Sequence, residues 1–200
     1  MVTRRRKSRA EKVEALADRC LCWTTDDPLF MVYRDEWGVP VRDERLLFEQ
    51  LVLSGFQAGL SWRTILYKRE NFRRAFHNFD ADRVATYGAR DRRRLLADAG
   101  IIRNRQKIEA AINNAKTVLT VREEFGGFSD YLWDFIGGRP IRRRHPGGQT
   151  PDRSSESDAL SKDLQSRGFR FVGSTIIYAF MQGVGLVNDH RSSCPRAQVD

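Results

Sequence analysis

The first third of the chain concentrates large aromatic side chains that carry a polar tip, namely Trp23, Tyr33, Trp37 and Trp62. Electron-rich faces of this kind attract a cation and stack on a flat ring, most strongly where water is excluded. The alternative for each ring is packing in the hydrophobic core, where large aromatic side chains are also common. The cluster therefore predicts either a pocket for a flat, positively charged ring or a part of the core.

The histidines and cysteines argue against two other kinds of site. The chain has three of each, and because three cysteines cannot all pair with one another, a disulfide framework is not expected. His77 and His145 have no partner at ligand spacing and are read as ordinary surface or loop residues. A metal-dependent hydrolase is disfavoured, since no motif offers an activated metal-bound water.

The net charge of +9 lies mainly in two segments. Residues 1–19 hold seven Lys or Arg against three acids, and residues 138–153 hold five Arg against one Asp, so each segment carries +4. Both are polar, and the second is rich in Gly and Pro. We therefore expect a basic N-terminal tail at 1–19 and a mobile basic loop near 138–156. Flexible arginines strengthen phosphate contacts by releasing counterions, but solvated surface arginines are the equal alternative.

Composition favours one domain in the cell interior. No apolar run approaches the roughly 20 residues of a membrane span, and the N-terminal residues lack the apolar stretch of a secretory signal. A chain of 200 residues with 40% hydrophobic content can form one core of ordinary size. We expect a cytoplasmic protein with a single domain at 20–200 and no membrane partner.

Helical spacing recurs along the chain, and strand patterns are scarce. Asp43 could cap a helix that carries Leu51 and Ser54 on one side. Two apolar stripes have three- and four-residue intervals: Ile108, Ala111, Ile112, Ala115, Val118 and Leu119, and then Ile177, Phe180, Val184 and Val187. Gly100 and Gly168 follow charged helical patterns, where a left-handed C-terminal cap favours glycine. The predicted fold class is a compact all-α domain.

Residues 95–107 (LLADAGIIRNRQK) are predicted to form a hairpin between two helices. A tight turn at Gly100 could aim backbone N–H groups and a helix N-terminus at a phosphate. Arg103, Arg105 and Lys107 lie close by in the sequence and would add positive charge. The alternative is a packed helix junction, because two isoleucines follow the glycine.

Several long motifs occur in one order along the chain: CWTTDDPLFMVYRDEWGVP, LVLSGFQAGLSW, WRTILYKRENFRRAF, DAGIIRNRQKIEAAINNA and RGFRFVGSTIIYAFMQGVGLVNDHRSSC. In these motifs the chain resembles the 3-methyladenine DNA glycosylase I family over nearly its whole length. The resemblance implies a helix-hairpin-helix glycosylase fold. It also implies a monomeric repair enzyme that removes 3-methyladenine from double-stranded DNA and leaves an abasic site.

The resemblance also implies a set of site residues. Tyr33, Trp37 and Trp62 would frame a pocket for the extruded base, and Gln57 would lie in its wall. The turn that contains Gly59 and Leu60 would approach the DNA. No catalytic carboxylate is evident, but a base turned out of the duplex with its own positive charge leaves as a neutral molecule and needs no strong acid to protonate it.

Ser54 departs from the family pattern, which usually has a glutamate at this position. Serine keeps an acceptor but loses the negative charge that would face the base, and losing a charge-assisted hydrogen bond costs about 1.5 to 3 kcal/mol. Glu49, Asp35 or Glu36 could compensate. We expect slower excision of 3-methyladenine; the alternative is a non-catalytic or retuned homologue that binds damaged DNA without efficient base release.

A structural zinc ion is the one cofactor that the resemblance implies. His190 and Cys194 reproduce the last pair of ligands, with a spacing that lets both side chains reach one ion. Cys20 or Cys22 could be the first ligand, but Arg34 stands where the family has a histidine. Three outcomes stay open: both early cysteines complete a four-ligand site, three ligands bind zinc weakly, or no metal binds.

Overall fold

The computed structural model describes residues 25–143 and 151–198. The predicted tail at 1–19 lies outside the described residues, as do Cys20, Cys22 and Trp23. The helices are α2 Pro28–Glu36, α3 Glu44–Gln57, α4 Trp62–Ala75, α5 Ala81–Ala85, α6 Ala89–Ala97, α7 Arg105–Phe125, α8 Phe128–Phe135, α9 Ser155–Ser166 and α10 Ser174–Gly183. Two short 3-10 helices, η1 His77–Phe79 and η2 Pro195–Gln198, and two short strands, β1 Ile141–Arg142 and β2 Val187–Asn188, complete the description. The predicted all-α fold class is confirmed.

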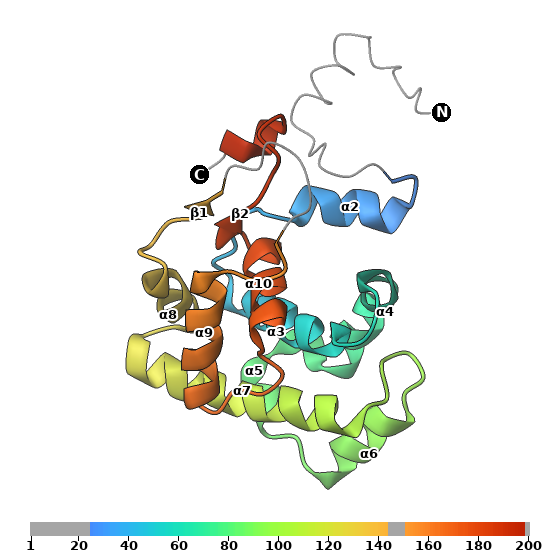
Figure 1. Ribbon diagram of the computed structural model, residues 1–200. Coiled ribbons are helices and arrows are strands. Elements are labelled where there is room, and N and C mark those ends of the chain that lie inside the picture. Colours follow the sequence, from blue (N-terminus) through green and yellow to red (C-terminus); the bar gives the residue numbers. More distant parts are fainter. Residues whose placement is uncertain (1–24, 144–150, 199–200) are drawn as a thin grey trace, which may run out of the picture.

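The helices pack in layers around α3 (Figure 1). The long helix α7 crosses the lower part of the molecule as drawn, with α5 packed on it and α6 below it. Helix α10 contacts both α3 and α9, whereas α4 contacts α3 on the opposite side. Helix α2 lies at the far end together with β1, β2 and the C-terminal residues. The centre of the molecule is therefore α3, the helix that carries Ser54.

Side chains at the helix ends explain where α3 and α7 begin. The carboxylate of Asp43 accepts a hydrogen bond from the backbone N–H of Leu46 at 2.9 Å, as predicted for a cap. The side chain of Asn104 accepts one from the N–H of Lys107 at 3.1 Å and starts α7. The apolar stripe predicted from Ile108 onward lies on the buried face of α7 and is confirmed.

Two predictions about helix ends need correction. The stripe from Ile177 to Val187 is not one helix, because α10 ends at Gly183 and Val187 belongs to β2. Gly185 turns the chain there with φ +72°, and a Cβ on it would lie 2.5 Å from the backbone N of Pro40. Gly168 has the predicted left-handed conformation, with φ +96°, whereas Gly100 has not.

Part of the segment near 138–156, predicted to be a mobile loop, forms regular structure at its two ends. Strand β1 pairs in parallel with β2, with Ile141 opposite Val187 and Arg142 opposite Asn188. The N–H of Ile141 donates to the carbonyl of Leu186 at 2.9 Å, and α9 begins at Ser155. Residues 144–150 of the loop lie outside the described part of the chain.

The hydrophobic core is dominated by phenylalanine. Fully buried rings come from α3, α4, η1, α8, α10 and the residue between α4 and η1: Phe48, Phe56, Phe72, Phe76, Phe79, Phe128 and Phe180. Phe56 and Phe72 meet edge to face with their ring centroids 4.8 Å apart, which fixes α4 against α3. Within the described residues, no helix combines the length and apolar character needed to cross a membrane.

Candidate functional site

A tight turn joins α3 to α4 and places several predicted site residues. Gly59 has φ +74°, a conformation that favours glycine. The N–H of Leu60 donates to the carbonyl of Gln57 at 2.7 Å, which closes the turn. The hydroxyl of Ser61 accepts a hydrogen bond from the N–H of Thr64 and caps α4. Trp62 is therefore held at the first position of α4, directly after the turn.

Tyr33 and Trp62 form the ring pair that the sequence analysis placed in the pocket. Their centroids lie 5.0 Å apart with the planes inclined by 44°. Tyr33 comes from α2 and is only 7% exposed. Burial raises the pKa of its hydroxyl above the ordinary value, so the phenol stays neutral near pH 7. The two rings present neutral aromatic surface.

A cavity of about 210 Å³ lies beside the turn. Its walls are Ser54, Gln57, Ala58, Gly59, Leu60, Thr175, Ile176 and Ala179. Ser54 is 2% exposed, and its hydroxyl oxygen is buried without a hydrogen-bond partner. The indole nitrogen of Trp62 is likewise buried and has no partner. Buried polar groups normally have partners, so the hydroxyl of Ser54, which lines the cavity, is available to a ligand there.

The structure places Trp37 against the C-terminal segment. Trp37 packs edge-on against His190, with the ring centroids 4.8 Å apart. It follows α2 directly, and its N–H donates to the carbonyl of Tyr33 at 2.8 Å. Trp37 thus lies between α2 and the C-terminal segment, and Tyr33, four residues earlier, contacts Trp62.

A second cavity, of about 430 Å³, borders Tyr33 among the described residues. It is lined by Tyr33, Asp35, Glu36, Val39, Val41, Leu46, Gln50, Arg69, Arg73, Gly183 and Val184. The side chain of Gln50 is hydrogen bonded to the Tyr33 hydroxyl. Sequence reasoning missed Gln50, although it lies one helical turn before Ser54 on α3 and so shares a side of the helix with it. Gln50 fixes the orientation of the Tyr33 ring.

The acidic residues proposed to compensate for Ser54 are engaged elsewhere. Glu49 is 3% exposed, and its carboxylate pairs with Arg69 at 2.5 Å and with Arg73 at 2.9 Å. Glu36 pairs with the same Arg69 at 2.5 Å. Asp35 does not line the cavity that contains Ser54. These carboxylates therefore tie helices together rather than face the hydroxyl of Ser54.

The predicted hairpin forms between α6 and α7, and Arg103 and Arg105 are exposed on it. Gly100 differs from the prediction, because its N–H donates to the side chain of Asp98 at 2.7 Å and is not directed at a phosphate. A Cβ on Gly100 would lie 3.1 Å from Cγ of Asn71, so glycine is needed here for packing. Of the predicted DNA contacts on the hairpin, the exposed side chains of Arg103 and Arg105 therefore remain candidates.

Lys107 also differs from its predicted role at the DNA surface. It is 8% exposed, and its ammonium nitrogen donates to the carbonyls of Phe56 at 2.8 Å and Ala58 at 2.6 Å. These carbonyls lie at the C-terminal end of α3, where backbone oxygens lack helical partners. Lys107 therefore holds the start of α7 against the turn after α3, and burial lowers its pKa.

Two of the predicted metal ligands meet. The Sγ of Cys194 lies 3.9 Å from Nδ1 of His190, close enough for both to bind one tetrahedral ion. Burial lowers the pKa of His190 to about 4, which leaves the neutral imidazole that a metal requires. No cluster of three ligating side chains occurs in the part of the chain that the structure describes. Arg34 is 9% exposed, and its Nε has no hydrogen-bond partner.

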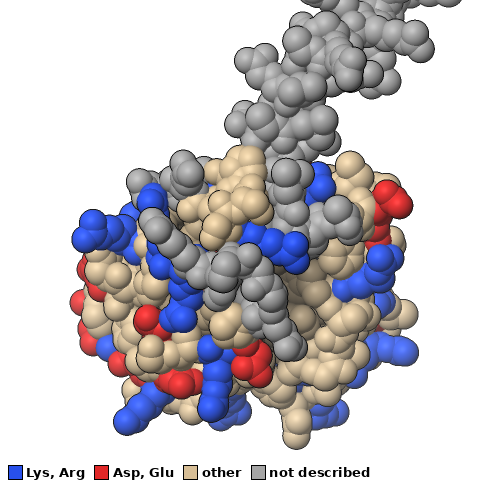
Figure 2. All heavy atoms as spheres, turned by 45° about the horizontal axis from the view of Figure 1, so that its top comes forward, with Lys and Arg blue, Asp and Glu red and all other residues tan. Residues whose placement is uncertain are grey.

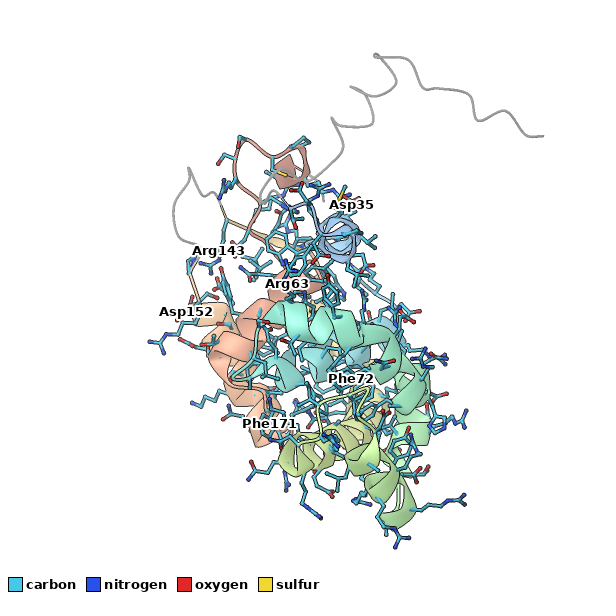
Figure 3. All side chains as sticks on the ribbon, turned by 90° about the vertical axis from the view of Figure 1, so that its right-hand side faces the viewer. Asp35, Arg63, Phe72, Arg143, Asp152 and Phe171 are labelled. Atoms are coloured by element: carbon cyan, nitrogen blue, oxygen red, sulfur yellow. The ribbon has the colours of Figure 1, made fainter. Side chains whose placement is uncertain are left out.

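Charges are mixed on the surface around α2 and the C-terminal segment. Figure 2 shows Lys and Arg side chains interspersed with Asp and Glu on this face. Arg63, next to Trp62 in sequence, lies toward α2 in Figure 3, whereas Phe72 lies farther along α4. An ion pair of 2.7 Å joins Arg63 to Asp27, the N-cap of α2. The ring pair thus lies where α2 and α4 are joined.

Comparison with known proteins gives consistent matches over most of the chain. Residues 23–197 match a family model described as methyladenine glycosylase. DNA-3-methyladenine glycosylase 1 of Escherichia coli is 49% identical over 179 residues, which cover 88% of this chain and 95% of that protein. DNA-3-methyladenine glycosylase of Haemophilus influenzae is 44% identical over 175 residues, covering 86% and 95%.

Solved structures match the fold as well. A crystal structure of 3-methyladenine DNA glycosylase I superposes with a TM-score of 0.81 at 50% identity, covering 88% of this chain and 97% of that one. The Staphylococcus aureus enzyme, solved to explain its recognition of 3-methyladenine, gives 0.84 at 34% identity, with 90% and 97% covered.

Proposed function

The chain belongs to the methyladenine glycosylase family, and on this premise we propose that it is a DNA repair enzyme that excises 3-methyladenine. The reaction hydrolyses the N-glycosidic bond and leaves an abasic site. One structural observation carries the proposal. The hydroxyl of Ser54 is buried without a partner in the wall of the cavity beside the α3–α4 turn, and Trp62, which is paired with Tyr33, directly follows that turn.

The aromatic pair explains selection of a methylated adenine. Methylation at N3 makes adenine cationic, and the faces of Tyr33 and Trp62 attract a cation by about 1 to 2 kcal/mol once water is excluded. The base must leave the duplex to reach such a site, and the rings replace part of the stacking that it loses. Gln50 and the burial of Tyr33 hold that ring in place before the base arrives.

The chemistry needs little from the protein beyond position. Water attacks the sugar carbon C1′, the bond from C1′ to N9 breaks, and its electron pair neutralises the departing base. One proton from the water passes to solvent. The cationic base is its own good leaving group, so the neutral phenol of Tyr33 and the hydroxyl of Ser54 suffice to orient it.

The DNA partner is double-stranded, and the chain acts as a monomer in the cytoplasm. The turn at Gly59 and Leu60 supports a DNA-facing role, because Leu60 is 39% exposed at the edge of the cavity. Arg103 and Arg105 on the hairpin add phosphate contacts nearby in the fold. Sedimentation of the protein with and without a duplex oligonucleotide tests the stoichiometry.

A second function is favoured by one observation, the neutral lining around Ser54. A homologue that binds damaged DNA without efficient base release would also have the rings and the hairpin. Two assays separate the functions: release of free 3-methyladenine from methylated duplex DNA, and binding of a duplex that carries an abasic-site analogue. Release supports the glycosylase, whereas binding with no release supports the second function.

A structural zinc ion is a separate proposal. His190 and Cys194 would hold it together with the cysteines at 20 and 22, and it would tie the chain ends together away from the aromatic pair. Metal analysis of protein purified without a histidine tag is expected to give one zinc per chain. A content near zero would mean that packing alone holds the C-terminal segment.

A further inference from the structure

Two side chains of α4 hold the turn of the hairpin between α6 and α7. The ammonium nitrogen of Lys68 donates hydrogen bonds to the carbonyl of Ala99 at 3.0 Å and to that of Gly100 at 3.2 Å. The side-chain amide of Asn71 donates to the same Gly100 carbonyl at 3.2 Å. In Figure 1 this turn lies below α4, at the right of the molecule. The hairpin is therefore fastened to α4 through its own backbone.

The turn also packs closely against α4 and the core. A Cβ on Gly100 would lie 3.1 Å from Cγ and 3.2 Å from Cβ of Asn71, so the backbone of the turn directly contacts this side chain. Ile101, the next residue, is 3% exposed and belongs to the hydrophobic core. Because Ile101 keeps the hairpin attached, losing the hydrogen bonds from α4 would shift the turn rather than release it.

Helix α4 also carries the aromatic ring of Trp62 at its first position. Lys68 follows six residues later, which corresponds to about 9 Å along an α-helix. One helix thus connects a ring of the proposed base pocket to the hairpin and its exposed arginines. The lining of the cavity beside the α3–α4 turn includes neither Lys68 nor Asn71. Their influence on the base is therefore exerted through α4.

Removal of a base requires two contacts with the DNA at once. The backbone must be held by its phosphates while the base is turned out into its pocket. A displacement of about 1 Å between groups that must act together can slow a reaction about a hundredfold. We propose that Lys68 and Asn71 are positioning residues that set the distance between the phosphates held by the hairpin and the ring of Trp62. The inference rests on the proposed function.

Two variants test this role. Lys68→Met keeps the apolar stem of the side chain and removes both of its hydrogen bonds, whereas Asn71→Leu removes the third bond without a change in charge. Release of 3-methyladenine from methylated duplex DNA is measured in single turnovers at saturating protein. We expect the rate to fall about tenfold or more in Lys68→Met and about threefold or more in Asn71→Leu.

A conservative variant and a control accompany them. Lys68→Arg keeps a charged donor at the same place and is expected to restore a rate within about threefold of wild type. Lys162→Met removes an exposed lysine from α9, so it makes the same change in charge away from the hairpin. We expect Lys162→Met to release the base at the wild-type rate.

Two further measurements separate positioning from other roles. A merely stabilising residue would lower the melting temperature and leave the rate per folded molecule unchanged, so the rates are compared at a temperature where circular dichroism shows each variant to be folded. A direct contact between Lys68 and a phosphate would contribute about one unit to the slope of log K against log salt for an undamaged duplex. We expect both variants to keep the wild-type slope, because the hairpin arginines remain.

Each result bears on the inference. Slow release with an unchanged salt slope, restored in Lys68→Arg, would support it. Release at the wild-type rate by both folded variants would overturn it and leave the proposed function intact. A slope reduced by about one unit in Lys68→Met would also overturn it, since Lys68 would then contact the DNA itself. Release of no base by the wild-type protein would overturn the proposed function together with the inference.

Discussion

Replacing Lys107 by methionine tests how the DNA-facing turn is held. Methionine keeps a long apolar stem but removes the ammonium that donates to Phe56 and Ala58 at 2.8 and 2.6 Å. A hydrogen bond from a charged group contributes about 1.5 to 3 kcal/mol, and both bonds end on one nitrogen, so we expect a loss of about 2 to 4 kcal/mol. For a chain of this size, the melting temperature would fall by roughly 5 to 15 °C.

Lys116→Met is the matched control. Lys116 is an exposed lysine of the same helix, so the change in charge and in helix propensity is identical. We expect its free energy of unfolding to stay within about 0.5 kcal/mol of wild type. Thermal unfolding followed by circular dichroism measures both variants.

The dependence of DNA binding on salt decides between the two roles of Lys107. A lysine that contacts phosphate contributes about one unit to the slope of log K against log salt, and an internal lysine contributes none. We expect Lys107→Met to melt lower with an unchanged slope. Normal melting together with a reduced slope would refute the reasoning and restore the contact with DNA.

Three further predictions concern the pocket and the packing of the segment after α10. Trp62→Leu should slow release of 3-methyladenine about tenfold or more, because the cationic base loses its contact with one aromatic ring. The control is Phe135→Leu, which replaces an exposed ring on α8 and should leave the rate unchanged. Gly185→Ala should lower the free energy of unfolding by about 1 to 3 kcal/mol, since φ is +72° and the new Cβ would lie 2.5 Å from the backbone N of Pro40. An unchanged midpoint in urea titration would refute this. The rate of 3-methyladenine release should vary little between about pH 6 and 9. Burial raises the pKa of Tyr33, and the side chains that line the cavity at Ser54 have no group that titrates in this range. A bell-shaped profile of rate against pH would show that a titrating group takes part.

The sequence predicted the elements better than their ends. Spacing alone identified the buried face of α7 and the cap at Asp43, since both depend on residues close together in the chain. The end of α10 depends instead on Gly185 approaching Pro40, a contact between distant segments. The pairing of β1 with β2 is equally non-local and two residues long, too short for any alternating pattern.

The site shows the same division. Ser54, Gln57, Gly59 and Leu60 lie on one helix end and its turn, so the structure brings them to one cavity. The inward direction of Lys107 could not be predicted, because its acceptors belong to a helix about fifty residues earlier. Sequence spacing places a charge near a hairpin but does not say which way its side chain points.

The paired arginines on α4 have a consequence for how the protein searches DNA. Glu49, held by Arg69 and Arg73, joins α3 to α4 on the side away from the turn, and Lys107 fixes the other side. Because these ion pairs join α3 to α4 and Lys107 holds the carbonyls at the end of α3, the turn between the two helices has little freedom left to lose when it meets a duplex. Binding to undamaged DNA can then be brief and frequent, because the turn needs no conformational change before the protein binds or dissociates.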